Sequence, residues 1–293
     1  MKDLIVVGAG PAGVAAALYG RARGLEVTIF DPHGVGGLIA GASLVSHYPA
    51  LLGGESGAEF ASRMADQLKT SGVELVREEV KAIEQIEAGW RVSTAVETLS
   101  CKSLVLATGS TPRRPAIEGL PQKVAHFASA IDAKDRACLV VGGGDGAAKE
   151  ALALLDRGAK SLSLVFPEES LPCIAEFATP LKASPLVTLY PASSLTSIAQ
   201  DLTSAHLATA DGEVTLRCAE GLEVVICAGQ VPNDSLTSTL LGPGFVKADE
   251  GCQTSLPGLW VAGDLRDKKV RQVATAAADG AVAGIAAAAW AKK

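Results

Sequence analysis

Residues 8–13 of the chain read GAGPAG, a glycine pattern that can bring a backbone turn close to a diphosphate. A short apolar run at Leu4–Val7 precedes it, and an Ala-rich helical pattern follows. In this order the first glycine permits a tight turn, the second lets the backbone approach a pyrophosphate, and the third lets helix and strand pack closely. The helix start then supplies unpaired amides to the phosphates. The candidate contact residues are Gly8, Gly10, Pro11, Ala12 and Gly13.

Asp31 lies 23 residues after Gly8, at the end of the next predicted strand, Leu25–Phe30. A carboxylate at this position can accept a hydrogen bond from an adenosine ribose hydroxyl. The strand, the helix and the acid together predict a dinucleotide site. The alternative is a glycine turn with a structural role alone.

A second glycine motif, GGGDGA at residues 142–147, begins 134 residues after the first and again lies between a strand and a helix. No Lys or Arg occurs from Ser161 to Leu181, whereas Glu168 follows the next predicted strand. A 2′-phosphate needs a cation there, and an acid pairs with a free 2′-hydroxyl, so the sequence disfavours NADPH and prefers NADH. The alternative is a site that keeps only its fold. The candidate residues are Gly142, Gly144, Asp145, Gly146, Ala147 and Glu168.

These repeated strand, turn and helix patterns predict an α/β protein with two Rossmann-like, three-layer nucleotide-binding domains. Pro112, Pro115 and Pro121 mark a linker into the second domain, and a second switch is expected near Gly242–Gly244. We therefore predict a discontinuous first domain, residues 1–112 and 243–293, with an inserted domain at 113–242.

The composition of the 293 residues fits a soluble globular protein of about two domains, with 48% hydrophobic and 20% charged residues. The net charge of −6 gives no basic field, so nucleic acid is not expected as a partner. The apolar stretch Val273–Trp290 is mostly Ala and Gly and includes Asp279, which favours a buried helix over a membrane span. The first residues show no signal-peptide pattern, and we expect a cytoplasmic protein.

Six cysteines are scattered along the chain, and the closest pair, Cys218 and Cys227, is nine residues apart. This spacing excludes a zinc ribbon and a vicinal redox dithiol, and it is typical of thiols in a reducing compartment. No metal site is predicted.

The chain resembles the low-molecular-weight thioredoxin reductase family of flavoproteins over nearly its whole length. The motifs that carry the resemblance are GAGPAG at 8–13, GGLIAG at 36–41, HYPALLGGESGAEF at 47–60, ATGS at 107–110, GGGDGA at 142–147, CAGQVPN at 227–233 and GLWVAGDLRDKKVRQVATAAADG at 258–280.

The resemblance implies a homodimer, with an FAD domain built from both ends of the chain and an inserted domain of the pyridine-nucleotide type. It places Asp264 at the ribityl or pyrophosphate region and His47 close to the isoalloxazine ring. A helix that begins near Gln272 would direct its positive end at the ring edge. The implied FAD residues are Gly8, Gly10, Pro11, Ala12, Gly13, Asp31, Gly36, Gly37, Leu38, His47, Thr108, Gly109, Gly263, Asp264, Arg271, Gln272 and Val273.

Two departures from the family decide the expected function. The position of its redox CxxC reads AHFA here, at Ala125–Ala128, and Cys138 is too isolated to replace it. The family's basic HRRxxxR motif is replaced at Phe166–Ser170. Disulfide reduction by the usual route is therefore excluded.

We expect an FAD-dependent oxidoreductase that passes electrons directly between the flavin and a small-molecule or protein partner, with NADH as the preferred donor. One alternative is a reductase linked to ferredoxin or flavodoxin and independent of pyridine nucleotides, and another is a flavin-binding sensor or assembly module. His47, Tyr48 and His126 are candidate residues near the flavin. Against these roles, Tyr48 fits a packed turn, and a lone His such as His126 is more often a surface or packing residue.

Overall fold

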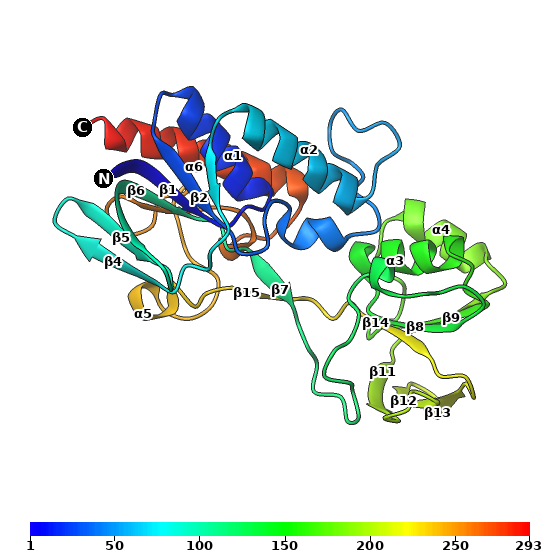
Figure 1. The fold of residues 1–293 in the computed structure, drawn as a ribbon. Coiled ribbons are helices and arrows are strands. Elements are labelled where there is room, and N and C mark those ends of the chain that lie inside the picture. The colour runs from blue at the N-terminus through cyan, green and yellow to red at the C-terminus, as the bar shows by residue number, and fades with distance from the viewer. The chain divides into compact units, whose positions relative to one another are not determined.

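The computed structural model describes residues 1–293 and divides the chain into two compact units (Figure 1). Unit 1 comprises Met1–Ala40, Val45–Thr111 and Val231–Lys293, and unit 2 comprises Gly41–Leu44 and Pro112–Gln230. The chain thus returns to unit 1 at Val231, twelve residues before the predicted boundary at 243. The physical reason is that residues 231–242 pack with unit 1: Asn233 bonds to Thr108 there, and Leu236 joins the core of that unit.

Unit 1 is built on a seven-stranded sheet in which the β-branched run at the start of the chain is central. The order is β3-β2-β1-β6-β5-β4, and β16 also pairs with β6. The strands β1, β2, β3, β6 and β16 are parallel, while the β4–β5 hairpin is antiparallel. The bounds are β1 Lys2–Val7, β2 Val27–Phe30, β3 Glu74–Val76, β4 Ala82–Ile86, β5 Gly89–Ser93, β6 Thr98–Leu106 and β16 Leu259–Val261.

Two layers cover the faces of this sheet. Side chains alternate along β1, so that Leu4 and Val6 face the helices, and Ile5 and Val7 face the opposite core. The segment 236–256 packs against that second core, which completes three layers. The helical elements of the unit are α1 Pro11–Ala22, η1 Gly37–Gly41, α2 Gly57–Thr70, α5 Ser238–Leu241, η3 Gly263–Leu265 and α6 Val273–Ala291.

The helix α6 is the one helix that is long and apolar enough to cross a membrane by length and composition alone. It lies along α1 at very short range (Figure 1). A Cβ placed on Gly280 would lie 2.0 Å from the carbonyl oxygen of Ala12, and one on Gly284 would lie 2.4 Å from that of Ala16. These two glycines therefore let the backbones of α1 and α6 come into direct contact. This close packing is what the prediction of a buried helix requires.

Replacing Gly280 by alanine should destabilise unit 1 by about 3 kcal/mol, because the added methyl group meets backbone that cannot move aside. The measurement is the urea midpoint, compared with Ala278→Ser on the exposed side of the same helix, which should change stability by less than about 0.5 kcal/mol. Equal midpoints for the two variants would contradict the close packing.

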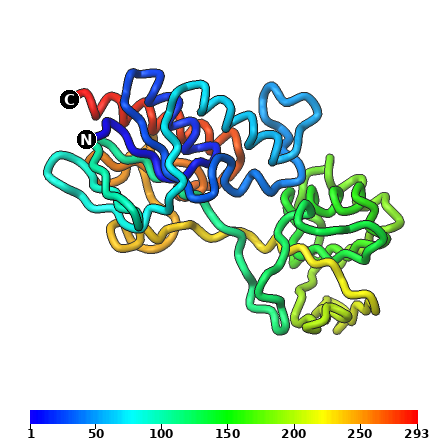
Figure 2. The backbone as a smooth tube through the Cα atoms, in the orientation of Figure 1, coloured from blue at the N-terminus to red at the C-terminus, as the bar shows by residue number.

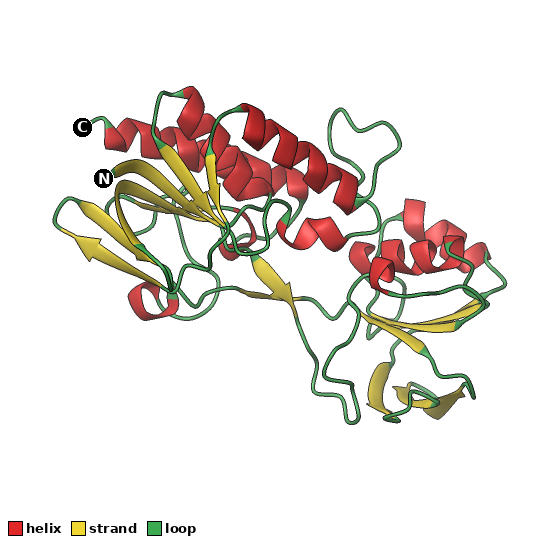
Figure 3. Cartoon of the chain, viewed as in Figure 1, coloured by secondary structure: helices red, strands yellow, loops and turns green.

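Unit 2 repeats the same strand, glycine turn and helix order on a smaller scale. Its four parallel strands run in the order β10-β9-β8-β14, with two helices on one face and an antiparallel three-stranded sheet on the other (Figure 3). The bounds are η2 Ala128–Ala130, β8 Ala137–Val141, α3 Asp145–Asp156, β9 Ser161–Val165, α4 Ala175–Ala183, β10 Val187–Tyr190, β11 Ser194–Ile198, β12 Ser204–Thr209, β13 Gly212–Arg217 and β14 Glu223–Ile226.

The chain passes between the units along β7, Ser110–Pro112, and β15, Gln230–Pro232, which pair with each other. The tube in Figure 2 places both termini in unit 1. There the Lys102 ammonium donates to the Asp3 carboxylate at 2.8 Å and to the Ala291 carbonyl at 3.4 Å, so the two ends of the chain lie together. The prediction of two Rossmann-like, three-layer units is confirmed.

Candidate functional site

The first glycine turn of unit 1 has the geometry of a phosphate cradle. Gly8 has φ +100°, and a Cβ there would lie 2.3 Å from the Ala107 carbonyl oxygen. A Cβ on Gly13 would lie 1.7 Å from the Gly8 carbonyl oxygen, so the turn admits no side chain at either position. At Gly10 the nearest atom would be 3.9 Å away, and no side chain caps the start of α1. The helix N-terminus is therefore open to a diphosphate beside Gly10.

Asp31 stands at the end of β2, as predicted, but most of its carboxylate is occupied by the protein itself. One oxygen accepts from the Ala9 amide at 2.8 Å, and the other accepts from His33 at 2.9 Å and Gly34 at 3.2 Å. A carboxylate offers about four acceptor positions, so one remains for a ribose hydroxyl. Asp31 thus fixes the glycine turn in addition to its predicted binding role.

The segment that starts at Gly36 lies against the same turn. The Gly36 amide donates to the Ala9 carbonyl at 2.9 Å, and a Cβ on Gly37 would lie 3.2 Å from the Cα atom of Gly10. Gly36 and Gly37 have φ values of +132° and +59°, which glycine adopts readily. Leu38 follows within η1, Gly37–Gly41. These residues line the cradle next to Gly10.

His47 and Tyr48 follow in a loop of unit 1. His47 has φ +56°, and its Nδ1 lies 3.3 Å from the Ser46 hydroxyl. The Tyr48 ring packs edge-on against Phe60 of α2, with ring centroids 5.3 Å apart. This contact favours the packing interpretation of Tyr48, and the flavin-proximal role of His47 stays a prediction.

Thr108 and Gly109, predicted at the cradle, are held by a residue that the sequence argument did not single out. The Thr108 hydroxyl donates to the Asn233 carbonyl, and the Asn233 amide group donates to the Thr108 carbonyl, both at 2.8 Å. Asn233 ends the CAGQVPN motif, which was the signal that could have identified it. The structure therefore shows Asn233 to be a support for this turn.

The turn at Gly263–Asp264 contains a buried acceptor without a hydrogen bond. Gly263 has φ +75°, and Asp264 Oδ1 is buried without a hydrogen bond. Burial raises the pKa of Asp264, while the nearby Lys268 and Arg271 lower it. An orphaned acceptor beside the α1 start fits a ligand hydroxyl. The open cradle, the glycines and this acceptor together fit an FAD-type dinucleotide.

The helix α6 starts at Val273, within a residue of its predicted start. Gln272 forms a capping box with Thr275, whose hydroxyl accepts from the Gln272 amide at 3.1 Å. The Arg271 guanidinium lies over the Phe245 ring, 3.9 Å from its centroid. The capping box does not use every backbone amide in the first turn of α6. The remaining amides are available for the predicted contact with the flavin edge.

The second glycine turn, in unit 2, repeats the first closely. Gly142 has φ +129°, and a Cβ there would lie 2.4 Å from the Cys227 carbonyl oxygen. Gly144 and Gly146 are exposed, with nothing within 4 Å of a built Cβ. The Asp145 carboxylate accepts from the Ile174 amide at 3.0 Å and so holds the loop before α4, while Ala147 is buried. The turn remains open to phosphates.

The acid expected beside this second turn is absent from the matching position. Val7 pairs with Phe30 in unit 1, and Val141 pairs with Val165 in unit 2, so Phe166 is the counterpart of Asp31. Phe166 is 1% exposed. A Cβ on the neighbouring Gly143 would lie 2.8 Å from the Cβ atom of Phe166, so the two residues are in close contact. Glu168, predicted to pair with ribose, is exposed two residues further on. Sequence counting alone did not show this offset, because it depends on strand register.

Hydrogen bonds within unit 2 hold the segment at the expected dithiol position, Ala125–Ala128. The Ile226 amide donates to the Ala125 carbonyl at 2.9 Å, and the Ala128 amide donates to Glu150 at 2.7 Å. His126 Nδ1 lies 2.8 Å from the Ile226 carbonyl oxygen. Because a carbonyl only accepts, Nδ1 carries the proton, and Nε2 of the neutral ring keeps a lone pair. This contact holds the half-buried ring of His126 in one orientation.

All six cysteines are free thiols, and burial raises the pKa of five of them. It raises the pKa of Cys101 and of Cys227 to about 12, and the pKa of Cys138 and of Cys252 to about 11. At neutral pH these residues carry almost no thiolate, which is the nucleophilic form.

We expect Ellman's reagent to react slowly with the native protein near neutral pH and with all six thiols after unfolding in guanidinium. In the native protein the thiols of Cys101, Cys138, Cys227 and Cys252 keep their protons above the ordinary pKa of 9.0, whereas in the unfolded chain they do not. The stability that these four thiols contribute is therefore complete below pH 9.0. It falls as the pH rises toward their pKa values in the folded protein. Rapid modification of two native thiols would contradict this expectation.

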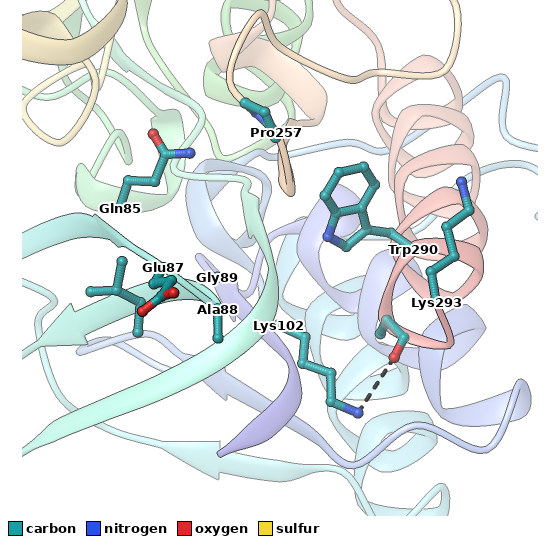
Figure 4. A pocket seen from close by; sticks show the side chains of 10 residues that line it. Gln85, Glu87, Ala88, Gly89, Lys102, Pro257, Trp290 and Lys293 are labelled. Carbon is teal, nitrogen blue, oxygen red and sulfur yellow. Dashed lines mark hydrogen bonds between the residues drawn. The ribbon is translucent and has the colours of Figure 1, made fainter.

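No group of three His, Cys, Asp or Glu side chains could hold a metal ion. A cavity of about 330 Å³ lies elsewhere in unit 1, at the tip of the β4–β5 hairpin (Figure 4). Lys102, Trp290 and Lys293 line it, and none of the predicted site residues does. This cavity is separate from the dinucleotide cradle.

The comparisons with known proteins agree with this geometry. Residues 2–280 match the family described as pyridine nucleotide-disulphide oxidoreductase. The chain belongs to the pyridine nucleotide-disulphide oxidoreductase family. Family membership makes it an oxidoreductase and implies sites for FAD and a pyridine nucleotide.

Its similar relatives within the family are thioredoxin reductases. One from Ureaplasma parvum is 32% identical over 300 residues, covering 97% of this chain and 94% of that protein. One from Peptoclostridium acidaminophilum is 30% identical over 299 residues, covering 96% and 94%. The crystal structure of Lactococcus lactis thioredoxin reductase has a TM-score of 0.92 at 25% identity and covers 100% of this chain and 99% of that one. The chain therefore has the thioredoxin reductase architecture.

Proposed function

We propose that the chain is an FAD-dependent oxidoreductase that exchanges electrons directly between the flavin and a small-molecule or protein partner, without a dithiol centre. The observation that carries this proposal is the pairing of a complete dinucleotide cradle in unit 1 with six free, separated cysteines. No cysteine stands at Ala125–Ala128, where the resemblance expects the redox pair.

FAD would supply two-electron redox chemistry at its flavin ring. The chain's own residues bind and orient it. Gly10 and the open start of α1 receive the pyrophosphate, Asp31 offers one acceptor to the ribose, and Asp264 offers an acceptor to the ribityl chain. The first turn of α6 presents amides to the ring edge. His126 offers a lone pair for proton transfer at the position of the lost dithiol.

We further propose that NADH is preferred to NADPH as the electron donor. The open turn at Gly144–Gly146 supports nucleotide binding in unit 2. The absence of Lys and Arg from Ser161 to Leu181, together with the exposed Glu168 and Glu169, makes a 2′-phosphate unfavourable there.

The experiment is anaerobic mixing of the purified holoprotein with NADH or NADPH, followed by the loss of oxidised flavin absorbance. We expect NADH to reduce the flavin at least about 10-fold faster than NADPH. Equal rates would contradict the donor preference. FAD that is tightly bound and reduced by no donor would favour the alternative of a sensor or assembly module.

One observation favours a second donor class. Because Phe166 occupies the place of the ribose-binding acid, unit 2 has no carboxylate at the position that Asp31 holds in unit 1. A reductase that receives electrons from a ferredoxin-like protein needs no such contact. A third arm of the same experiment, with a reduced ferredoxin, tests this alternative. Rapid reduction by ferredoxin and none by NADH would establish it.

We also propose a cytoplasmic homodimer. The free cysteines fit a reducing compartment. The outward side of α6 is apolar, with Ala278, Val282, Ile285 and Ala289 exposed, which suits contact with a second copy. Light scattering should give twice the chain mass for the wild type and a monomer for Ile285→Glu. A monomeric wild type would contradict the dimer.

A further inference from the structure

A compact group of charged side chains lies between the Gly263–Asp264 turn and α6. The Lys268 ammonium donates to Asp279 Oδ2 at 2.9 Å and to the Thr275 hydroxyl at 3.4 Å, and it lies 3.8 Å from Asp264 Oδ1. The Lys268 side chain is only 12% exposed. A lysine this deeply buried is normally held by opposite charges, as this one is.

The other cation beside Asp279 is Arg266, and its guanidinium group makes hydrogen bonds to two residues. The Arg266 guanidinium donates to Asp279 Oδ1 at 2.9 Å and to the Asp249 carbonyl at 2.8 Å. Asp279 Oδ2 also accepts from the Gly263 amide at 3.2 Å. Asp279 therefore ties the turn to α6, while Lys268 is the one ammonium group that reaches both aspartates.

Arg271 is less suited to support Asp264. Its guanidinium stacks on Phe245 and donates to the Arg266 carbonyl at 3.4 Å. Lys269, the next residue after Lys268, is exposed. Asp264 Oδ1 itself is buried and accepts no hydrogen bond. The nearest cation that can fix its charge and direction is Lys268.

We propose that Lys268 is a positioning residue for FAD. Its ammonium group keeps the Asp264 carboxylate ionised and directed as an acceptor for a ribityl hydroxyl. The proposal rests on the proposed function, because it assumes that FAD occupies the unit 1 cradle. It adds a residue outside the cradle that controls how tightly the cofactor is held.

The pH dependence of this effect follows from the groups that face Asp264. Burial raises the pKa of Asp264, Lys268 and Arg271 lower it, and Asp279 raises it. Removing the Lys268 charge raises that pKa further. Because only the ionised carboxylate accepts well, FAD affinity in the variant should begin to fall at a higher pH than in the wild type.

The test is titration of apoprotein with FAD, followed by flavin fluorescence, from about pH 5 to about pH 9. The variants are Lys268→Met, Lys268→Arg and the matched neighbour Lys269→Met. We expect Lys268→Met to weaken FAD binding about 10-fold more at the acid end than at the alkaline end. Lys268→Arg should restore most of the affinity, and Lys269→Met should stay within about 2-fold of the wild type.

Two results would overturn the proposal alone while wild-type protein still binds FAD. One is unchanged affinity in Lys268→Met at every pH. The other is an equal loss at every pH together with a lower melting temperature of the apoprotein, which would show a purely structural role. Failure of the wild-type protein to bind FAD would instead overturn the proposed function, and this proposal with it.

Discussion

Replacing Gly10 by alanine should give a folded protein that has lost about 100-fold in affinity for FAD. The added methyl group would have no protein atom nearer than 3.9 Å, so unit 1 accepts it. It would point into the space where the second glycine of the motif admits a pyrophosphate. The loss of affinity would then come from a clash between the methyl group and FAD, and not from damage to the fold. The measurement is the dissociation constant of FAD from apoprotein, together with the urea midpoint.

Two other glycines make this prediction specific. Gly13→Ala places a methyl group 1.7 Å from the Gly8 carbonyl oxygen, and it should lower the urea midpoint as well as FAD binding. Gly146→Ala, at the open turn of unit 2, meets no atom within 4 Å and should leave FAD affinity unchanged. If Gly10→Ala bound FAD as tightly as the wild type, the cradle would not be the pyrophosphate site.

The parts of the fold that the sequence predicted are those set by local chemistry. The tight turns at Gly8 and Gly142 are encoded by glycine spacing and by the apolar runs before them, so both nucleotide units were found. The lack of a dithiol centre, expected from the cysteine spacing, stays a prediction. The start of α6 near Gln272 was implied by the family resemblance, and the structure places it at Val273.

The parts that the sequence did not predict depend on contacts between distant segments. The return of the chain to unit 1 at Val231 rests on the bonds between Asn233 and Thr108, which are 125 residues apart. The counterpart of Asp31 proved to be Phe166 only when strand register was known. The contacts of Lys268 with Asp279 and Asp264 likewise join residues whose pairing no local pattern indicates.

Replacing His126 by asparagine should separate proton transfer from electron transfer. The asparagine side-chain amide can still donate to the Ile226 carbonyl, as Nδ1 does at 2.8 Å, but it offers no basic nitrogen in place of Nε2. Reduction of a quinone consumes protons, whereas ferricyanide takes single electrons and no proton. We therefore expect turnover with a quinone to fall about 100-fold, and turnover with ferricyanide to stay near the wild-type rate.

The matched control is His206→Asn, because His206 lies on β12 of the same unit and is exposed, and its Nδ1 lies 3.1 Å from the Thr215 hydroxyl. This variant should behave as the wild type with both acceptors. A loss with both acceptors in His126→Asn would indicate damage to the fold or to donor binding, which FAD content and the urea midpoint would reveal. Unchanged quinone turnover would show that His126 carries no proton. Protons would then have to come from solvent or from another group.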